Sequence, residues 1–443
     1  MALPRTSIRS FLIQAKTALR SAIANKQPVT LVIGNSSAGA HPHPQSPPHH
    51  HHHHHHHYPN PPAADLDSLT SALVYAYLRS TTASPPSPAH LHIPLANIPA
   101  SALRLRPELH ALLPHAGLAP HHLLTLDDLP AAAAVVAALP PENTRWVLVD
   151  HNALQGRLGA LYGARVVGAV DHHADERAVP PDTGVEPRVI AAAGSCTSLV
   201  VEVCREAWDA AGDAVGPDAE GVRLWDAQVA TLAIASVLVD TRALRDESRV
   251  TAHDVRAVEY LEAKIAAAGA AWDRERFYRE IEGAKGEVGA LGVGDLLAGD
   301  YKEWEEGRGK VGISSVGRPV AFLRERASAE AGGKEGDAAL VEAMRGFAEE
   351  RGLSVYAVMT TSTSDEGEFR RELLVWALDR DSIGAAKRFA DGAAEELGLE
   401  EWRGQPHGLD ELDTDREWRK VWRQRKVENS RKQVAPLLRE AMR

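Results

Sequence analysis

Acidic residues that follow short apolar runs are the part of this sequence best suited to chemistry. Asp150 follows the apolar run 145–149, and Asp171 follows the run 166–170 and is itself followed by His172. Because ligands of an open α/β sheet bind at the carboxyl ends of its strands, we expect these side chains to share one pocket. Carboxylates and an imidazole suit a hard divalent cation such as Mn²⁺ or Mg²⁺ better than a thiolate site would.

Three further carboxylates stand where regular elements are expected to begin or end. Asp65 and Asp67 precede an apolar stretch, and Asp240 ends another. Each has an ordinary alternative, namely a turn or a helix cap. Gathered in one cleft with the strand-end carboxylates, however, they would repel one another without cations. Two divalent ions roughly 3.5–4 Å apart, bridged by one carboxylate, would neutralise them, generate a hydroxide nucleophile and clamp a phosphoryl group.

Basic residues late in the chain could bind that phosphoryl group, because a chain with a net charge of −11 needs local positive charge to hold a polyanion. Arg431 and Lys432 follow turn-forming residues and precede an apolar run, which predicts a turn or a helix start at this point. Arg370 and Arg371 form a second basic pair at the head of an apolar strand. For the remaining cations of 416–443, a solvated helix face is the alternative.

The composition is globular, and 443 residues are enough for two domains. The negative net charge argues against general nucleic-acid coating. Cys196 and Cys204 are the only cysteines, which excludes a disulfide framework and a thiolate zinc site and suits a reducing compartment. No apolar run is expected to span a bilayer. We therefore expect no nucleic-acid or membrane partner, and a monomer or small homo-oligomer.

The beginning of the chain permits two interpretations. Residues 1–64 contain no Asp or Glu, and their basic residues on a helix-prone stretch could form a mitochondrial transit peptide. Apolar residues recur at helical spacing from Ile8 to Ile23 and lead directly into a strand at 29–33, which favours a packed first helix. The predicted location is the cytoplasm, with the mitochondrial matrix as the alternative.

Alternating strand-like and helical stretches predict an α/β fold, with a doubly wound, mainly parallel sheet in residues 1–243. A low-complexity His- and Pro-rich insert, 39–62, interrupts this domain. It is interpreted as a surface loop, with adventitious metal binding as the alternative. Residues 244–275 predict a helical linker. Residues 276–443 hold separate apolar runs between helical stretches and predict a smaller α+β domain.

Four local predictions bear on the site. Residues 69–79 are expected to form a helix capped by Ser68 or Asp67, and residues 123–126 a strand. The other two are helices, expected at 195–210 and 226–239.

The motifs together resemble the DHH phosphoesterases, a family named for the triplet that is Asp171-His172-His173 here. The resemblance covers nearly the whole chain and is strongest to the cytosolic exopolyphosphatases, which are related to prune and to the family II inorganic pyrophosphatases. Pyrophosphatases carry His where this chain has Asn35. The other matching segments are Gly34-Asn35, Ala64-Asp65-Leu66-Asp67-Ser68, Gly194-Ser195-Cys196-Thr197-Ser198, Val239-Asp240-Thr241 and Ser430-Arg431-Lys432.

The resemblance implies a fold, a cofactor and a set of ligands. The active site would lie in the cleft between the two domains and hold two divalent cations, Mn²⁺ or Mg²⁺. Asp65 and Asp150 would hold one cation, with Asn35 nearby. The ligands of the other would be Asp67, Asp150, His172 and Asp240, so that Asp150 bridges the pair.

The resemblance also implies an activity, which is the metal-dependent release of terminal phosphate from inorganic polyphosphate. His173 would contact the substrate and assist proton transfer, and Arg431 and Lys432 would bind phosphate. Arg371, and Lys285 as the nearest candidate for a lysine that pyrophosphatases use, complete the expected substrate set. The alternatives are a pyrophosphatase, a prune-like cyclic nucleotide phosphodiesterase and a catalytically silent scaffold. The complete ligand set argues against the scaffold.

Overall fold

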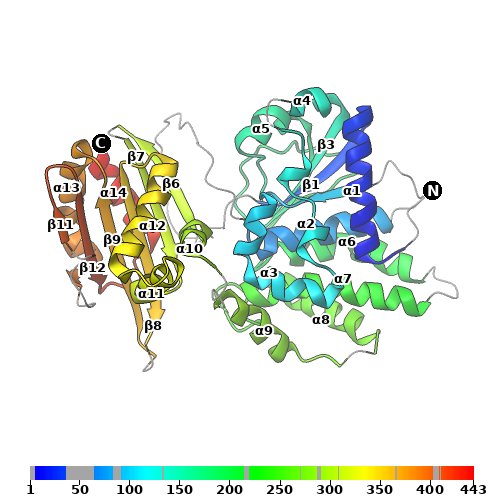
Figure 1. The fold of residues 1–443 in the computed structure, drawn as a ribbon. Helices are drawn as coiled ribbons and strands as arrows, with labels where there is room; N and C mark the ends of the chain where they lie inside the picture. Colours follow the sequence, from blue (N-terminus) through cyan, green and yellow to red (C-terminus); the bar gives the residue numbers. More distant parts are fainter. Residues whose placement is uncertain are drawn as a thin grey trace. The chain divides into compact units, whose positions relative to one another are not determined.

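The chain separates into two compact units, unit 1 (Met1–Glu287) and unit 2 (Val288–Arg443) (Figure 1). The division falls later than the expected boundary after residue 275. The insert 39–62 lies outside the residues that the structure describes. The computed structural model describes residues 5–35, 64–82, 91–131, 134–213, 219–269, 271–286, 291–307, 309–364, 367–402, 409 and 411–443.

Unit 1 is built on a five-stranded parallel sheet in the order β2-β1-β3-β4-β5. Its strands are β1 (Val29–Ile33), β2 (His92–Leu95), β3 (Thr144–Val149), β4 (Val166–Asp171) and β5 (Arg188–Ile190). The chain moves outward from β1 to β2 and then returns to the other side of β1 to form β3. This order confirms the predicted doubly wound sheet. It also makes the carboxyl ends of β1 and β3 the switch point at which such sheets bind ligands.

The long helices of unit 1 contribute to one hydrophobic core with the sheet. They are α1 (Ile8–Asn25), α2 (Leu66–Thr81), α6 (Cys196–Asp213), α7 (Ala219–Asp240), α8 (Ala252–Ala266) and α9 (Arg274–Gly286). Shorter helices are α3 (Pro107–Leu112), α4 (Val135–Ala138) and α5 (Gly156–Tyr162). In α1, Ile8, Phe11, Leu12, Ala15 and Leu19 are fully buried, as expected for a packed first helix.

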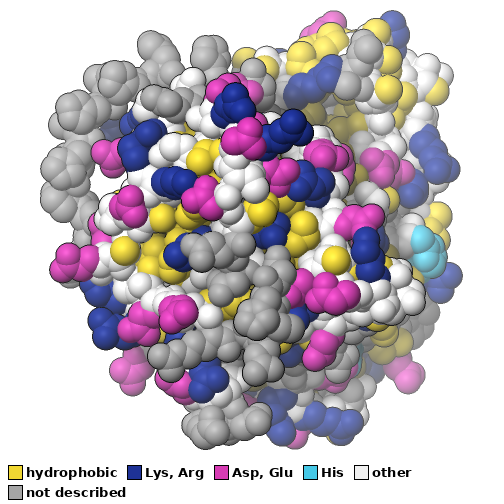
Figure 2. Space-filling model, turned by 60° about the vertical axis from the view of Figure 1, so that its left-hand side comes forward, with side chains coloured by type: hydrophobic (Ala, Val, Ile, Leu, Met, Phe, Trp, Pro, Cys, Tyr) yellow, Lys and Arg dark blue, Asp and Glu magenta, His cyan; other side chains and the backbone are white. Residues whose placement is uncertain are grey.

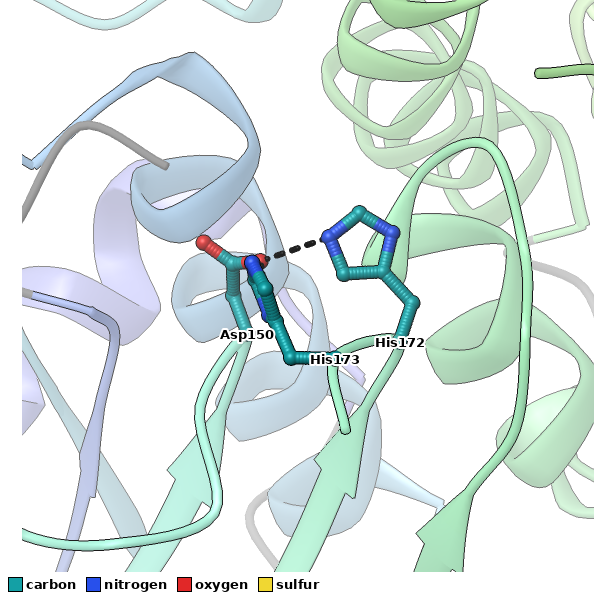
Figure 3. A group of neighbouring side chains, drawn as sticks. All are labelled: Asp150, His172 and His173. Carbon is teal, nitrogen blue, oxygen red and sulfur yellow. Dashed lines mark ion pairs between the residues drawn. The ribbon is translucent and has the colours of Figure 1, made fainter. Parts of the chain in front are cut away.

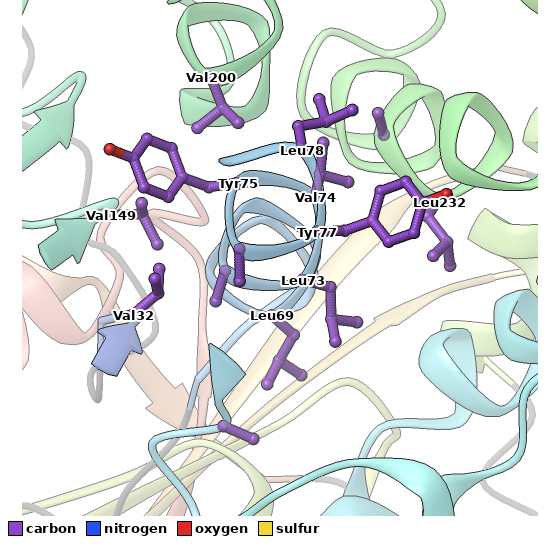
Figure 4. Close-up of a cluster of buried hydrophobic side chains, with 14 of the residues drawn as sticks. Val32, Leu69, Leu73, Val74, Tyr75, Tyr77, Leu78, Val149, Val200 and Leu232 are labelled. Carbon is purple, nitrogen blue, oxygen red and sulfur yellow. The ribbon is translucent and has the colours of Figure 1, made fainter. Parts of the chain in front are cut away.

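Helix α2 lies at the centre of unit 1. Every residue of α2 except Arg79 is buried. Figure 4 shows its apolar side chains enclosed by Val32 and Val149 of the sheet and by Val200 and Leu232 of α6 and α7. A helix buried on all sides is held from every direction, so its first turn is fixed in place.

Three expectations for unit 1 are corrected. Residues 244–275 are not an independent linker, because α8 buries Val258, Leu261 and Ile265 in the unit 1 core. Residues 123–126 form no strand, and only Thr125 makes an isolated bridge, to Ala96. Among the described residues, the helix Glu220–Asp240 is long and apolar enough to cross a membrane, contrary to expectation. However, 78% of its most apolar window is buried inside the structure, and a core helix passes the same test.

Unit 2 is a mixed sheet in the order β10-β12-β9-β8-β7-β6, with β11 paired to β12. Its strands are β6 (Tyr301–Glu306), β7 (Gly309–Val316), β8 (Val355–Thr363), β9 (Phe369–Ala377), β10 (Leu399–Glu401), β11 (Glu411–Asp413) and β12 (Trp418–Gln424). Its helices are α10 (Val293–Gly299), α11 (Val320–Glu330), α12 (Gly336–Arg351), α13 (Arg380–Leu397) and α14 (Arg431–Met442).

Alternation along the strands of unit 2 divides its core into two. In β8, Tyr356 and Val358 join the core beneath α10, α11 and α12, whereas Val355 and Ala357 join the core beneath α13 and α14. Successive side chains of a strand point to opposite faces of the sheet, so both faces of β8 are covered by helices. The predicted α+β fold of the second domain is therefore confirmed, as a mixed sheet with helices on both faces, although α9 (Arg274–Gly286) belongs to unit 1.

Candidate metal centre

Asp150 stands directly after β3 in a conformation that few residues adopt. Its φ is 62°, in the left-handed region that is uncommon for residues other than glycine. Its backbone N–H donates to the Val170 carbonyl oxygen at 3.0 Å and lies 3.2 Å from Cys196 Sγ. The surrounding contacts thus hold the backbone turned out of the strand direction, as is often seen at functional sites.

The first turn of α2 brings Asp65 and Asp67 to the same edge of the sheet. Asp65, rather than Ser68 or Asp67, caps the helix, because its carboxylate accepts from the Ser68 backbone N–H at 3.0 Å. The Ser68 hydroxyl donates to Asp150, which ties the helix start to the end of β3. A Cβ on Gly34 would lie 2.5 Å from the Ser68 carbonyl oxygen, so this approach requires glycine.

Asp67 is held more firmly than any other member of the site. It is 4% exposed, and donors from the start of α6 surround its carboxylate. They are Ser195 Oγ at 2.7 Å, the Cys196 N–H at 2.6 Å, and the Thr197 N–H and Oγ1 at 3.0 and 2.7 Å. These hydrogen bonds fix the orientation of the Asp67 carboxylate.

The two histidines after β4 face Asp150 from different sides (Figure 3). His172 Nε2 lies 3.0 Å from Asp150 Oδ1 and 4.0 Å from Asp67 Oδ2. Its other nitrogen, Nδ1, lies 3.0 Å from the Ala193 carbonyl oxygen. In the neutral ring this bond places the proton on Nδ1 and directs the Nε2 lone pair toward the carboxylates, as in metal-ligating histidines.

His173 is oriented by Asp171. Its Nδ1 lies 2.8 Å from Asp171 Oδ1, and Asp171 Oδ2 accepts from Asn152 Nδ2 at 2.5 Å. Asp171 is thus engaged through both oxygens and fully buried, and it orients His173. The ligand atoms of Asp150, His172 and His173 lie within 4.8 Å of one another.

Asp240 ends α7 beside this group, as expected. Its Oδ2 is buried and has no hydrogen-bond partner among the described residues. Burial, followed by the charges of Asp67 and Asp65, raises the pKa of Asp240 well above its ordinary value. A buried carboxylate oxygen without a partner, beside other carboxylates, is energetically costly, and a bound cation would offset this cost.

The same crowding perturbs Asp150 and His172. Burial and the neighbouring charge of Asp65 raise the pKa of Asp150 to about 7. Burial opposes the charged form of His172, but the bond to Asp150 and the charge of Asp67 outweigh it and raise the pKa to about 10. The imidazolium therefore supplies a positive charge that a metal ion could replace, with release of its proton. These residues fit a divalent cation.

Two expected members lie at the margin of this group. Asn35 follows β1 and is 8% exposed, at the switch point of the sheet. Lys285 lies in α9 of unit 1, not in the second unit as expected. It pairs with Glu282 at 3.3 Å, and its positive charge counteracts the raised pKa of Asp240.

The expected phosphate-binding cations of unit 2 lie at or near the start of α14. α14 begins at Arg431, as predicted, and Arg431 contacts Asp300 through Nη2–Oδ1 at 2.7 Å. Burial and the charges of Arg431 and Lys432 lower the pKa of Lys302, a cation that the sequence did not single out. Arg371 Nε donates to the Val427 carbonyl oxygen at 2.5 Å, in the loop that leads into α14.

Other cations of the C-terminal run do not join this group through the contacts described. Arg423 pairs with Glu368 at 3.3 Å, and Arg425 pairs with Glu400 at 3.5 Å. On the face drawn in Figure 2, basic and acidic side chains are interspersed and form no continuous basic stripe. This mixture is typical of a solvated surface.

Sequence reasoning missed the residues that hold the ligands. Ser68, Ser195 and Thr197 donate to Asp150 or Asp67, and Asn152 donates to Asp171. The motifs containing Ser68 and Ser195 were recognised, but a hydroxyl in a motif does not reveal its acceptor. Only the packing of α2 against α6 and β3 does so.

Comparisons with known proteins give two sequence matches and one structural match. Residues 279–441 match the DHHA2 domain family. A Schizosaccharomyces pombe protein named as a candidate exopolyphosphatase is 28% identical over 384 residues, which span 86% of this chain and 89% of that protein. The crystal structure of a candidate family II inorganic pyrophosphatase from Methanococcus jannaschii covers 86% of this chain and 97% of its own, with a TM-score of 0.45 and 19% identity.

The first two findings confirm the resemblance to the DHH phosphoesterases. Within that class, the similarity is to the exopolyphosphatases.

Proposed function

We propose that the chain is a metal-dependent hydrolase of phosphoanhydride bonds that releases terminal phosphate from inorganic polyphosphate. One observation carries the proposal: Asp67, Asp150, Asp240 and His172 are gathered at the carboxyl edge of the unit 1 sheet, with a buried carboxylate oxygen left unpartnered. The similarity to a protein named as an exopolyphosphatase supports the substrate class.

The proposed cofactor is a pair of divalent cations, Mn²⁺ or Mg²⁺. Asp65 and Asp150 would hold one, with Asn35 beside it. The ligands of the other would be Asp67, Asp150, His172 and Asp240. When bound, the cations would neutralise the carboxylates, polarise a phosphoryl group and lower the pKa of a water molecule.

His173 is the proposed proton donor. Burial opposes the charged form of His173, but the bond to Asp171 outweighs it and raises the pKa of the ring. Asp171 engages Nδ1, so Nε2 is the nitrogen proposed to act on a substrate oxygen. A proton delivered there would stabilise the phosphate that leaves.

Arg431 and Lys432, with Arg371, are proposed to bind the same phosphate chain. Arg431 and Lys432 occupy the first turn of α14, where backbone N–H groups also favour anions. Because Arg431 is paired with Asp300, the substrate would have to compete with that carboxylate for the guanidinium. This competition favours substrates that carry several negative charges.

The cytoplasm is the proposed location and a monomer or small homo-oligomer the proposed assembly. Helix α1 buries its apolar face in the unit 1 core, which favours a retained structural element over a cleaved transit peptide.

One assay tests the activity. Phosphate release is measured from long polyphosphate, tripolyphosphate, pyrophosphate and a cyclic nucleotide, each with Mn²⁺ and with Mg²⁺. We expect release from polyphosphate that depends on the metal. Faster turnover of pyrophosphate would favour a pyrophosphatase, and faster turnover of the cyclic nucleotide would favour a phosphodiesterase. No phosphate release from any substrate would favour a catalytically silent scaffold.

A further inference from the structure

The segment 193–198, which includes the start of α6, orients two proposed ligands of the same cation. Its Ser195, Cys196 and Thr197 donate to Asp67, and its Ala193 carbonyl oxygen lies 3.0 Å from His172 Nδ1. A shift of this segment would therefore move a carboxylate and an imidazole together. Contacts with another part of the chain must therefore hold this segment in position.

Asp254, from the first turn of α8, also forms hydrogen bonds with this segment. Its side chain is fully buried. Asp254 Oδ2 accepts from the Gly194 N–H at 2.9 Å, and Oδ1 accepts from the Ser195 N–H at 3.2 Å and from Ser198 Oγ at 2.7 Å. A Cβ on Gly194 would lie 2.9 Å from Asp254 Oδ2, so glycine permits this close approach.

The same segment reaches a third proposed ligand through packing. A Cβ on Gly194 would lie 2.7 Å from Cγ2 of Thr241, the residue directly after Asp240. Gly194 is therefore packed between Asp254 and the end of α7.

We propose that Asp254 is a positioning residue for the metal centre. It fixes the segment 193–198, and the segment in turn fixes Asp67 and His172. The inference rests on the proposed metal-dependent function. It assigns a task in the site to α8, a helix whose sequence suggested only a linker.

A purely structural role is the competing explanation, because Asp254 also caps α8. Its Oδ2 accepts from the Thr251 N–H and from Thr251 Oγ1, each at 2.8 Å. Loss of the carboxylate would thus destabilise α8 in any case. The test must therefore measure metal affinity and not stability or turnover alone.

The test is Asp254→Asn in the full chain, titrated with Mn²⁺ by calorimetry after metal removal. Asn replaces one acceptor oxygen by an NH₂ group that would face donors, so the segment loses part of its anchor. We expect Mn²⁺ affinity to fall about 10- to 100-fold, as for partners that orient metal ligands. Affinity within twofold of wild type in the folded variant would overturn the proposal.

A matched control is Asp226→Asn, which removes another buried carboxylate of unit 1. Asp226 contacts Arg5 and accepts from Trp208 Nε1 at 2.8 Å, and among the described residues it makes no hydrogen bond or ion pair with a proposed ligand. Its loss should lower the melting temperature and leave Mn²⁺ affinity within twofold of wild type. An equal loss of affinity in both variants would mean that general destabilisation explains the result, and would overturn the positioning role.

A second pair of variants applies if Asp254→Asn does not fold. Ser198→Ala removes a bond from Asp254 to the α6 start, whereas Thr251→Ala removes only bonds within the α8 cap. The proposal expects a several-fold loss of affinity in Ser198→Ala alone, and equal affinities would overturn it. Absence of Mn²⁺ binding by the wild type would instead refute the proposed function, and this inference with it.

Discussion

The proposed metal ligands of unit 1 and the basic residues of unit 2 are held in different ways. In unit 1, Asp67 and Asp150 are almost fully buried and are fixed by hydrogen bonds from α2, α6 and the end of β4. In unit 2, Arg423 and Arg425 are about half or more exposed and face single acidic partners across the surface. Arg431 is intermediate, since its side chain is 16% exposed and bonded to one aspartate.

This difference matches the two tasks that the proposed polyphosphate hydrolase would have to perform. A metal centre requires ligands fixed within a few tenths of an ångström, and a buried helix with saturated hydrogen bonds provides this. A repetitive, flexible polyanion needs charge more than exact geometry, and exchangeable ion pairs on a surface provide that. Substitutions of the proposed metal ligands in unit 1 should therefore abolish phosphate release. Substitutions of the basic residues in unit 2 should mainly change substrate affinity.

The largest effect is expected from Asp150→Asn. Asn tolerates the left-handed backbone at this position, so the fold should be retained while the proposed bridging charge is lost. We expect phosphate release to fall about a thousandfold or more, since metal-based charge stabilisation is worth several kcal/mol. Release within tenfold of wild type at saturating Mn²⁺ would contradict the bridging role. Asp182→Asn, at an exposed position in unit 1, is the control.

The next effect concerns the stability of unit 1 in acid. Although burial opposes its ionisation, contacts with His92, Arg79 and Tyr75 lower the pKa of Glu186 from 4.5 to about 2. A lowered folded-state pKa contributes stability above pH 4.5, and the contribution is lost as the pH falls toward 2. Its full size is about 3 kcal/mol. Chemical denaturation between pH 6 and pH 2 measures it, and Glu186→Gln should reduce this pH dependence. An unchanged pH profile in the variant would exclude Glu186 as its source.

A smaller effect is expected from the start of α14. Arg431→Ala and Lys432→Ala should each lower kcat/KM about 10- to 100-fold on every phosphate substrate, the worth of one charged hydrogen bond. Arg439→Ala is the matched control, because Arg439 lies on the same helix and bonds to Glu306 at 2.5 Å. A loss confined to long polyphosphate would place Arg431 and Lys432 away from the reacting phosphates.

The smallest effect is expected from the outer cations. Joint replacement of Arg423, Arg425 and Lys426 by Ala should raise KM for long polyphosphate about two- to fivefold at low salt and leave tripolyphosphate unchanged. The expected change is modest because Glu368 and Glu400 already offset two of these charges. Equal effects on both substrates, or none on either, would mean that these three residues are part of a solvated surface and do not bind long polyphosphate.

The sequence predicted the elements of the site better than their contacts. The apolar runs ending at Asp150 and Asp171 predicted parallel strands, and the turn-forming residues before Arg431 predicted the start of α14. Patterns of this kind are local, so the sequence displays them directly. The left-handed backbone of Asp150 and the donors around Asp67 arise from packing between segments far apart in the chain, and no local pattern encodes them.

Two incorrect predictions, the linker at 244–275 and the strand at 123–126, have the same cause. Residues 244–275 looked polar and linker-like, yet Val258, Leu261 and Ile265 form one buried stripe of α8. Residues 123–126 are apolar enough for a strand, but apart from the Thr125 bridge no neighbouring strand pairs with them among the described residues. Burial of a face and availability of a partner strand are properties of the fold, and composition alone does not decide them.

The number of Mn²⁺ ions bound by the metal-free full chain tests the central claim most directly. Equilibrium dialysis of the wild type and of Asp150→Asn, with folding checked by circular dichroism, gives this number for each protein. We predict two ions for each wild-type chain and at least one fewer for the variant. No bound Mn²⁺ in the wild type, or two ions in both proteins at the same affinity, would contradict a two-cation centre bridged by Asp150.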